Sequence, residues 1–372
     1  MSCDLSLLPV SPANDPWDPI YSLRKYGKHT LTSVEMTVTN LCNMRCEHCA
    51  VGDALVSIEG PKLPLELMLR RLDEIDTLET ISITGGEPTF DMRNIKEYLL
   101  PLLQYARKRG IKSQLNSNLT LDYARYEMIA EYLDVMHISF NYTDFEDFAE
   151  VGFVKSERKP PKSRAEMMFN HMVENTKRLT SGGLFVSAES MINYRTHKKI
   201  DQIHELIVDM GCQRHEVHPM YPSSFAAHLP ILSLQETREA IERLLDARNP
   251  EIWMLFGTLP FYHCNRDEED QKLLKRLKRE PNITVRNDPD GRNRLNVNLF
   301  TGDAYVTDFS DLSTLGNIHQ DSLTAVFEKW RNHPLNGMIS CHCDQVSCCG
   351  PNLLVMDTYY KDVDFTRREA IL

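Results

Sequence analysis

The stretch Val34-Glu-Met-Thr-Val-Thr-Asn-Leu-Cys42-Asn-Met-Arg-Cys46-Glu-His-Cys49 joins a β-branched segment to three closely spaced cysteines. Val34–Val38 alternates between apolar and polar side chains, which predicts a β-strand. The cysteines follow this strand directly, and only three and then two residues separate them. Loops at strand ends often carry binding and catalytic groups. The segment therefore predicts a metal or redox site at the end of a strand.

Strands and helices alternate along the chain that follows. Further strands are predicted at Thr80–Ile83, Lys112–Leu115, Val135–Phe140, Leu184–Met191 and Glu216–Met220. Apolar residues with helical spacing predict helices between them, over Leu63–Ile75, Ile95–Arg109, Asp122–Leu133, Ala165–Leu179 and Lys198–Met210. Strands that alternate with helices form parallel βαβ units, so we expect an α/β fold. Six units are too few for a closed eight-stranded barrel, which favours a partial (β/α)6 barrel of the TIM type.

The pattern changes beyond the sixth strand. A single amphipathic helix, Leu232–Asp246, is followed by short strands with Asp-Gly and Thr-Gly turns, which indicate a small α+β module. We therefore divide the chain into an irregular lead-in (1–30), the partial barrel (31–225), a helical linker (226–260), the α+β module (261–350) and a tail (351–372).

The overall composition excludes some classes of protein. The chain has 372 residues and a net charge of −11, so a general nucleic-acid-binding surface is not expected. It has no apolar run long enough for a membrane span and no signal-peptide pattern at its start, which predicts a cytoplasmic protein. The chain has 10 cysteines. Since disulfides are rare in that compartment, clustered cysteines there indicate metal or redox chemistry.

The first cysteine group, Cys42, Cys46 and Cys49, permits three interpretations. A 4Fe–4S cluster normally takes four cysteines, so three would leave one iron open to a cofactor or substrate. Zinc could bind the same thiols with His48 as a fourth ligand. A thiol redox loop is the third interpretation. The spacing alone does not decide between iron–sulfur and zinc.

A second motif, Thr84-Gly-Gly-Glu-Pro88, ends the next predicted strand. Glycines at such a turn allow a ligand to approach the backbone closely. We expect the Glu87 carboxylate to lie beside this backbone and to face an ammonium group. Adjacent parallel strands would place this turn and the cysteine loop on the same rim of the barrel.

Together, the cysteine loop and the Gly-Gly-Glu turn resemble the radical S-adenosylmethionine (SAM) superfamily over about residues 31–225. The resemblance implies that Cys42, Cys46 and Cys49 bind a 4Fe–4S cluster whose open iron holds SAM. It implies that an electron from a flavodoxin- or ferredoxin-like donor cleaves SAM to methionine and a 5′-deoxyadenosyl radical, which takes hydrogen from a substrate. The residues assigned to the cofactor in the two motifs are His48, Gly85, Gly86 and Glu87.

Less specific matches extend this resemblance to later strand ends. Ile138-Ser-Phe-Asn141 is similar to a family Ser-x-Asp near the ribose, and Asn116-Ser-Asn118 is similar to its Thr-Asn-Gly. Polar residues of the fifth strand, Ser187 and Glu189, could reach the ribose hydroxyls. The added cofactor-binding candidates are Asn116, Ser139, Asn141 and Glu189. A turn that satisfies its own backbone is the alternative for each. His215, His218 and Tyr221 are candidates for the substrate pocket, although His218 could equally be a core histidine.

The second cysteine group, Cys341-His-Cys343-Asp-Gln-Val-Ser-Cys348-Cys349, indicates a further metal site, with zinc as the main competitor to iron–sulfur. The region resembles the SPASM or twitch extension of radical SAM enzymes, which carries auxiliary clusters. Thr307 stands five residues after Gly302, where that extension usually has a ligand cysteine, so one auxiliary 4Fe–4S cluster is expected. Its ligands would be Cys264, Cys341, Cys343 and Cys348.

The whole pattern resembles most the radical SAM/CxCxxxxC-motif family, YfkAB, and SPASM relatives suggest a peptide or protein substrate. Two other classes remain open: a zinc or thiol scaffold, and an iron–sulfur electron carrier without turnover. The basic segment Val154–Arg164 could contact an acidic peptide or a phosphate, but a solvated loop is the simpler interpretation.

Overall fold

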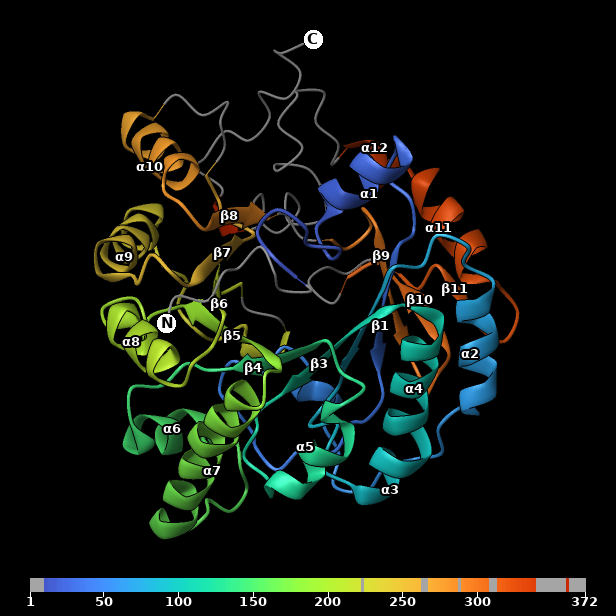
Figure 1. Ribbon diagram of the computed structural model, residues 1–372, viewed down its shortest axis with the longest axis horizontal. Coiled ribbons are helices and arrows are strands. Elements are labelled where there is room, and N and C mark those ends of the chain that lie inside the picture. Colours follow the sequence, from blue (N-terminus) through green and yellow to red (C-terminus); the bar gives the residue numbers. More distant parts are fainter. Residues whose placement is uncertain are drawn as a thin grey trace.

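The computed structural model describes residues 10–221, 224–261, 267–286, 289–307, 313–338 and 359–360. Within them, one curved sheet has the order β11-β10-β9-β1-β2-β3-β4-β5-β6-β7-β8, and helices cover its outer face (Figure 1). The strands are β1 (Ser33–Thr37), β2 (Thr80–Thr84), β3 (Lys112–Ser117), β4 (Val135–Ser139), β5 (Phe185–Ile192), β6 (Arg214–Pro219), β7 (Trp253–Gly257), β8 (Ile283–Arg286), β9 (Arg294–Asn298), β10 (Asp303–Tyr305) and β11 (Gly316–Asn317).

The helices follow the strands in the order expected for βα units. They are α1 (Pro19–Tyr26), α2 (Leu65–Asp73), α3 (Met92–Asn94), α4 (Leu100–Arg109), α5 (Tyr123–Ala130), α6 (Phe145–Gly152), α7 (Lys162–Ser181), α8 (Ile200–Asp209), α9 (Leu234–Ala247), α10 (Glu268–Arg279), α11 (Leu323–Arg331) and α12 (Pro334–Met338). Local signals define several ends. Ser233 and Glu236 form a capping box at the start of α9. Gly110, at φ +69°, ends α4 in the left-handed region, which glycine adopts without strain.

The α/β class and the open barrel are confirmed, but the parallel sheet is larger than six strands. β7 and β8 continue it beyond β6, and β9 adds a parallel strand beside β1. Residues 226–260, expected as a helical linker, therefore contain α9 and then the barrel strand β7. The sequence of β7, Trp-Met-Leu-Phe-Gly, is short and buried on both faces, so it lacks the alternation that marks a strand.

The two faces of the barrel strands differ in chemistry. Side chains that point outward, such as Val34, Ile81 and Val217, are apolar and pack in the main core under the helices. Side chains at the alternate positions, such as Glu35, His137 and Glu216, point inward and line a cavity. The apolar core thus lies between sheet and helices, and the inside of the barrel is left for polar groups.

The N-terminal segment closes the barrel below that cavity. Val10 and Trp17 join Val135, Phe185, Trp253 and Leu255 in a separate buried apolar cluster. The Trp17 indole Nε1 donates a hydrogen bond of 3.0 Å to Ser82 Oγ on β2. The segment expected to be an irregular lead-in is thus the floor of the barrel, followed by α1.

The last described part of the chain extends the same sheet. β10 and β11 continue it as antiparallel strands beyond β9. Trp330 on α11 is fully buried, and its Nε1 donates to Gly291 O at 2.8 Å. Arg71 of α2 donates through Nε to Ile318 O at 2.7 Å, which ties this part to the barrel helices. No helix in the described ranges has the length and apolar character needed to cross a membrane.

We expect Trp17→Ala to lower the free energy of unfolding of the full-length protein by about 3 kcal/mol, because it removes a large buried side chain from the floor. Trp17→Phe should cost only about 1 kcal/mol, since it keeps the apolar packing and removes the bond to Ser82. Denaturant unfolding followed by circular dichroism measures both changes. An alanine variant as stable as wild type would show that the floor contact does not stabilise the barrel.

Candidate active site

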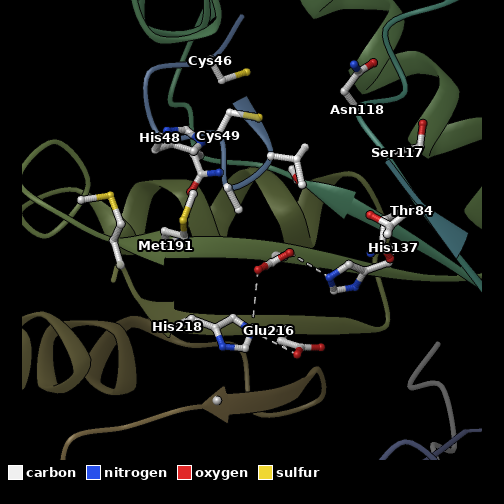
Figure 2. A pocket seen from close by; sticks show the side chains of 18 of the residues that line it. Cys46, His48, Cys49, Thr84, Ser117, Asn118, His137, Met191, Glu216 and His218 are labelled. Carbon is white, nitrogen blue, oxygen red and sulfur yellow. Dashed lines mark hydrogen bonds and ion pairs between the residues drawn. The ribbon is translucent and has the colours of Figure 1, made fainter. Parts of the chain in front are cut away.

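A cavity of about 390 Å³ lies inside the barrel, at the carboxyl-terminal side of its strands (Figure 2). Each of the nine parallel strands, β9 and β1–β8, contributes at least one residue to its wall. The cysteine loop and the Gly-Gly turn form one end, and charged side chains from β5, β6 and β8 form the opposite wall. The carboxyl-terminal rim is where enzymes of barrel folds place their active sites.

All three cysteines of the first group line this cavity as free thiols. Their loop is held from outside by α6: Arg45 N donates to Gly152 O at 2.9 Å, and Glu47 N donates to Val151 O at 3.0 Å. Burial raises the pKa of the Cys42 thiol to about 12 and also raises the pKa of Cys46. Isolated thiols here would stay protonated at neutral pH, whereas bound metal would draw them into the thiolate form.

Amide side chains surround the Cys42 sulfur. Asn118 Nδ2 lies 4.0 Å from Cys42 Sγ and donates to Asn43 Oδ1 at 2.9 Å. Asn43 Nδ2 in turn donates to Thr120 Oγ1 at 2.7 Å. The backbone N–H of Met44 points at the same sulfur from 3.4 Å. These donors fix the loop and favour negative charge on this sulfur.

The Gly-Gly turn is bonded to the cysteine loop through the backbone. Gly86 N donates to Thr39 O and Glu87 N donates to Leu41 O, both at 2.7 Å. A Cβ on Gly85 would stand 2.2 Å from Thr39 O, and Gly85 also has φ +138°. A Cβ on Gly86 would stand 2.2 Å from Leu41 O. Glycine is therefore required at both positions by the cysteine loop itself, and the turn presents bare backbone to the cavity.

The Glu87 carboxylate does not face the cavity, which corrects the expectation that it meets an ammonium group there. It is 1% exposed and accepts hydrogen bonds from Thr89, from Ser117 Oγ and from the backbone N–H of Asn118. Burial raises its pKa, although these donors oppose the shift. The side chain turns away because β3 ends beside the turn and supplies donors. Glu87 thus joins the ends of β2 and β3.

His48 lies on the cavity wall beside Cys49 (Figure 2). Burial lowers the pKa of its imidazole to about 4, so the ring is neutral at physiological pH. The zinc alternative needs His48 and the thiols around one ion, at about 2.0 to 2.3 Å. Among the described residues, no group of three His, Cys, Asp or Glu side chains could hold a single metal ion. Each cysteine of a 4Fe–4S cluster binds a different iron, so that cluster does not require the thiols to converge on one point.

The softer cofactor candidates all line the cavity, but in different ways. Ser139 is exposed to it at the end of β4, and Asn116 accepts a bond from Gln114 Nε2 at 3.0 Å. Asn141 is 3% exposed, and its Oδ1 accepts a bond from Met191 N at 2.7 Å, as the alternative of a strand-end turn predicts. The Glu189 side chain is 32% exposed, which is more than the charged side chains around it on β4, β6 and β8. Ser187 lies beneath the cavity and bonds to Arg214.

The charged wall is a continuous chain of acids and bases. His137 Nε2 is 3.0 Å from Glu189 Oε2, and Glu189 Oε1 is 3.8 Å from His218 Nε2. His218 Nε2 is 3.1 Å from Glu216 Oε1, which also pairs with Arg286 (Figure 2 draws the histidine and glutamate links). The chain crosses β4, β5, β6 and β8, so only the folded barrel brings it together.

Neighbouring charges set the ionisation of this chain. Burial alone would raise the pKa of Glu216, but Arg286 and Arg214 outweigh it and hold that pKa well below its usual range. Burial opposes the charged form of His218, yet its bond to Glu216 and the nearby Glu189 carboxylate raise its pKa. For Glu189, bonds to His137 exceed the effect of burial and lower the pKa.

Sequence reasoning missed most of the charged residues that point into the barrel. Glu35, His137, Glu216, Arg286 and Arg294 all line the cavity but were not candidates. Their signal was a charged or imidazole side chain at an inward position of an otherwise apolar strand.

The remaining candidates divide between cavity and core. His218 and Tyr221 line the cavity as predicted. His215 points the other way and is a buried core residue that contacts His204 and Ser190. Cys212 is also buried in the main core. The proposed auxiliary ligands Cys264, Cys341, Cys343 and Cys348 lie outside the described residues, so their role stays a prediction.

The residues present fit the cofactors that the sequence motifs imply. Three free cysteines stand at one end of the cavity, beside a turn of bare backbone that any side chain would obstruct. Thiolates suit iron–sulfur clusters, and exposed backbone groups suit the polar end of an amino acid. The cavity volume lies in the range of small-molecule sites.

Comparisons with known proteins identify the family and the fold. Residues 36–207 match the radical SAM superfamily, and residues 220–370 match the YfkB-like domain. Solved structures of similar fold include Streptococcus suis SuiB bound to S-adenosylmethionine, with 15% identity and a TM-score of 0.59 over 89% of this chain and 73% of that one. Another is anSMEcpe with bound AdoMet and Cp18Cys peptide, with 14% identity and a TM-score of 0.54 over 92% of this chain and 99% of that one.

A curated relative extends over the whole chain. The putative protein YfkA of Bacillus subtilis (strain 168) is 55% identical over 371 residues, which is 100% of both chains. The cysteine loop and the Gly-Gly turn both lie within the matched radical SAM region. This chain therefore belongs to the radical SAM superfamily, as a full-length relative of YfkA with a YfkB-like domain.

Proposed function

We propose that this radical SAM enzyme takes a hydrogen atom from a peptide or protein segment that enters the barrel cavity. The observation that carries the proposal is that backbone hydrogen bonds hold the cysteine loop and the Gly-Gly turn together at one end of a cavity. Charged side chains form the opposite wall of this cavity. Cofactor and substrate would then meet between these two ends.

The cofactors are a 4Fe–4S cluster and S-adenosylmethionine, which together supply a 5′-deoxyadenosyl radical when reduced. In our proposal Cys42, Cys46 and Cys49 hold the cluster, and the backbone of Gly85 and Gly86 receives the methionyl amino group. Asn118 and Asn43 keep the first cysteine in place through their amide chain. The polar residues nearest to the adenosyl end would be Asn116, Ser139 and Asn141, together with Glu189 of the charged wall, all of which line the cavity.

The charged wall would bind the substrate. His218 Nε2 lies between the carboxylates of Glu189 and Glu216, so a protonated imidazole would hold both acids in position at the cavity wall. Glu189 is partly exposed and can accept a bond from a substrate N–H while His137 supports it from behind. Such paired groups can orient a polar backbone or side chain and keep its C–H bond in position.

Two similar structures support a peptide as substrate class. SuiB of Streptococcus suis has been solved with precursor peptide SuiA, and anSMEcpe with the Cp18Cys peptide. We further propose one auxiliary 4Fe–4S cluster on Cys264, Cys341, Cys343 and Cys348, and a flavodoxin- or ferredoxin-like electron donor. An iron–sulfur electron carrier without turnover is the alternative, and it predicts cluster reduction without cleavage of S-adenosylmethionine.

We expect Cys46→Ala to abolish reductive cleavage of S-adenosylmethionine, because it removes one ligand of the three-cysteine site. The measurement is 5′-deoxyadenosine formed anaerobically with dithionite after iron and sulfide reconstitution. Cys212→Ala is the matched control, since Cys212 is buried in the core away from the cavity, and it should retain both iron and cleavage. Cleavage that survives in Cys46→Ala would refute the cluster assignment. Full cluster reduction without any cleavage in wild type would favour the carrier.

We expect Gly86→Ala to lower iron incorporation and the affinity for S-adenosylmethionine together by at least about tenfold, because its methyl group would push on Leu41 O and displace the cysteine loop. Iron analysis and equilibrium binding of S-adenosylmethionine measure the two effects. Gly60→Ala is the control, since nothing lies within 4 Å of its Cβ position. An alanine at residue 86 that leaves both quantities unchanged would contradict the proposed role of the turn.

We expect Cys343→Ala to lower the iron and sulfide content by about one cluster while some cleavage of S-adenosylmethionine remains, because the thiols of the second group bind separately from the first. Iron and sulfide analysis with electron paramagnetic resonance would count the clusters. Unchanged iron and sulfide would show that the second group holds no cluster.

A further inference from the structure

A short basic segment follows α6 on the surface. Between residues 155 and 164 the exposed charged side chains are five bases and one acid, Glu157. The bases are Lys155, Arg158, Lys159, Lys162 and Arg164. The whole chain has a net charge of −11, so this segment is opposite in sign to the average surface. A solvated loop explains its exposure, but its position in the fold adds a second observation.

The segment begins where α6 and its following turn contact the cysteine loop. Val151 O and Gly152 O accept bonds from Glu47 N and Arg45 N, and Lys155 N donates to Arg45 O at 3.2 Å. Residues 151–155 therefore run along residues 45–47, with Cys46 between the bonded pair. The first residue of the basic segment, Lys155, is thus hydrogen-bonded to Arg45, the neighbour of Cys46 in the chain.

The same lysine also covers the other side of that loop. Lys155 Nζ lies 5.5 Å from the centre of the Phe225 ring. The Phe225 ring packs against Gly52, just after Cys49, so closely that a Cβ on Gly52 would be 2.3 Å from it. The basic segment therefore lies outside the part of the loop that carries Cys46 and Cys49.

Several of these charges are available to a partner. Lys162 pairs with Glu146 at 3.2 Å and lies over the Phe145 ring. Within the described part of the chain, Arg158, Lys159 and Arg164 have no carboxylate within 4.0 Å. The nearby acid Glu150 is already paired with Arg195 at 2.8 Å. The free charge of the segment is therefore positive.

We propose that residues 155–164 are the docking surface for an acidic low-potential electron carrier of the flavodoxin or ferredoxin type. This inference rests on the proposed function, which requires one electron for each cleavage. That electron leaves the reduced carrier, which is oxidised by one electron, and enters the cluster behind Arg45 and Glu47. Charge complementarity favours an acidic partner, and electron-transfer complexes use small, weak interfaces of this kind.

The test compares two double variants of the reconstituted full chain. Arg158→Glu/Lys159→Glu reverses the docking charge. Lys275→Glu/Lys278→Glu makes the same change of net charge on exposed residues of α10, which Figure 1 shows well apart from α6 and α7. The probe is a strongly acidic flavodoxin. Its dissociation constant is measured by titration, and its rate of cluster reduction by stopped-flow absorbance.

For the docking variant we expect the dissociation constant for flavodoxin to rise roughly tenfold relative to wild type. We expect the rate at which flavodoxin reduces its cluster to fall by roughly the same factor. In the control variant both quantities should stay within about twofold of the wild-type values, because only the net charge of the protein has changed. Raising the ionic strength from about 0.05 to 0.3 M should slow wild type toward the docking variant. Equal binding and reduction of all three proteins, or equal losses in both variants, would overturn the docking assignment.

Dithionite separates this inference from the proposed function. Both variants should retain wild-type iron content and should cleave S-adenosylmethionine with dithionite, because their mutated residues do not line the cavity. A docking assignment that fails while dithionite-driven cleavage persists leaves the proposed function intact. Absence of cleavage with dithionite in every protein would instead refute the proposed function.

Discussion

The backbone contact between two strand-end loops organises the entire site. Thr37 of β1 and Thr84 of β2 stand level in a parallel register, so the loops after them leave the sheet at the same height. Two short N–H to carbonyl bonds then join the Gly-Gly turn to the cysteine loop. Buried backbone groups must be paired, and here each loop satisfies the other.

Side chains connect this pair of loops to the end of β3. Glu87 accepts a hydrogen bond from Asn118 N, just after β3, and the Asn118 side chain donates to Asn43 in the cysteine loop. Opposite, the chain from His137 to Arg286 buries several charges, which is costly unless each is paired. The alternation of the strands makes both arrangements compatible, because the apolar core lies on the other face of the sheet. The molecule thus separates stability and chemistry between the two faces of one sheet.

Sequence patterns predicted those elements whose structure depends mainly on residues close together in the chain. The first six strands, the cysteine loop and the Gly-Gly turn follow from side-chain alternation, spacing and turn chemistry. β7 was missed because a strand buried on both faces has no alternation. A strand near β9 was expected, at Leu295–Phe300 in the α+β module, but its pairing with β1 was not, because β1 is far away in the sequence. The direction of the Glu87 side chain depends on donors from β3, and the charged wall depends on four strands meeting. None of these relations can be seen within a single segment.

The position of β9 beside β1 has a consequence for dividing the chain. β9 comes from the YfkB-like region, yet it pairs along all five residues of the first radical SAM strand. A fragment that ended near residue 210 would expose two bare strand edges, at β1 and at β5, and such edges recruit other chains. The complementary fragment would carry the matching edges of β9 and β6. Each region therefore covers strand edges that the other would leave bare, so either region expressed alone is expected to be prone to association with other chains.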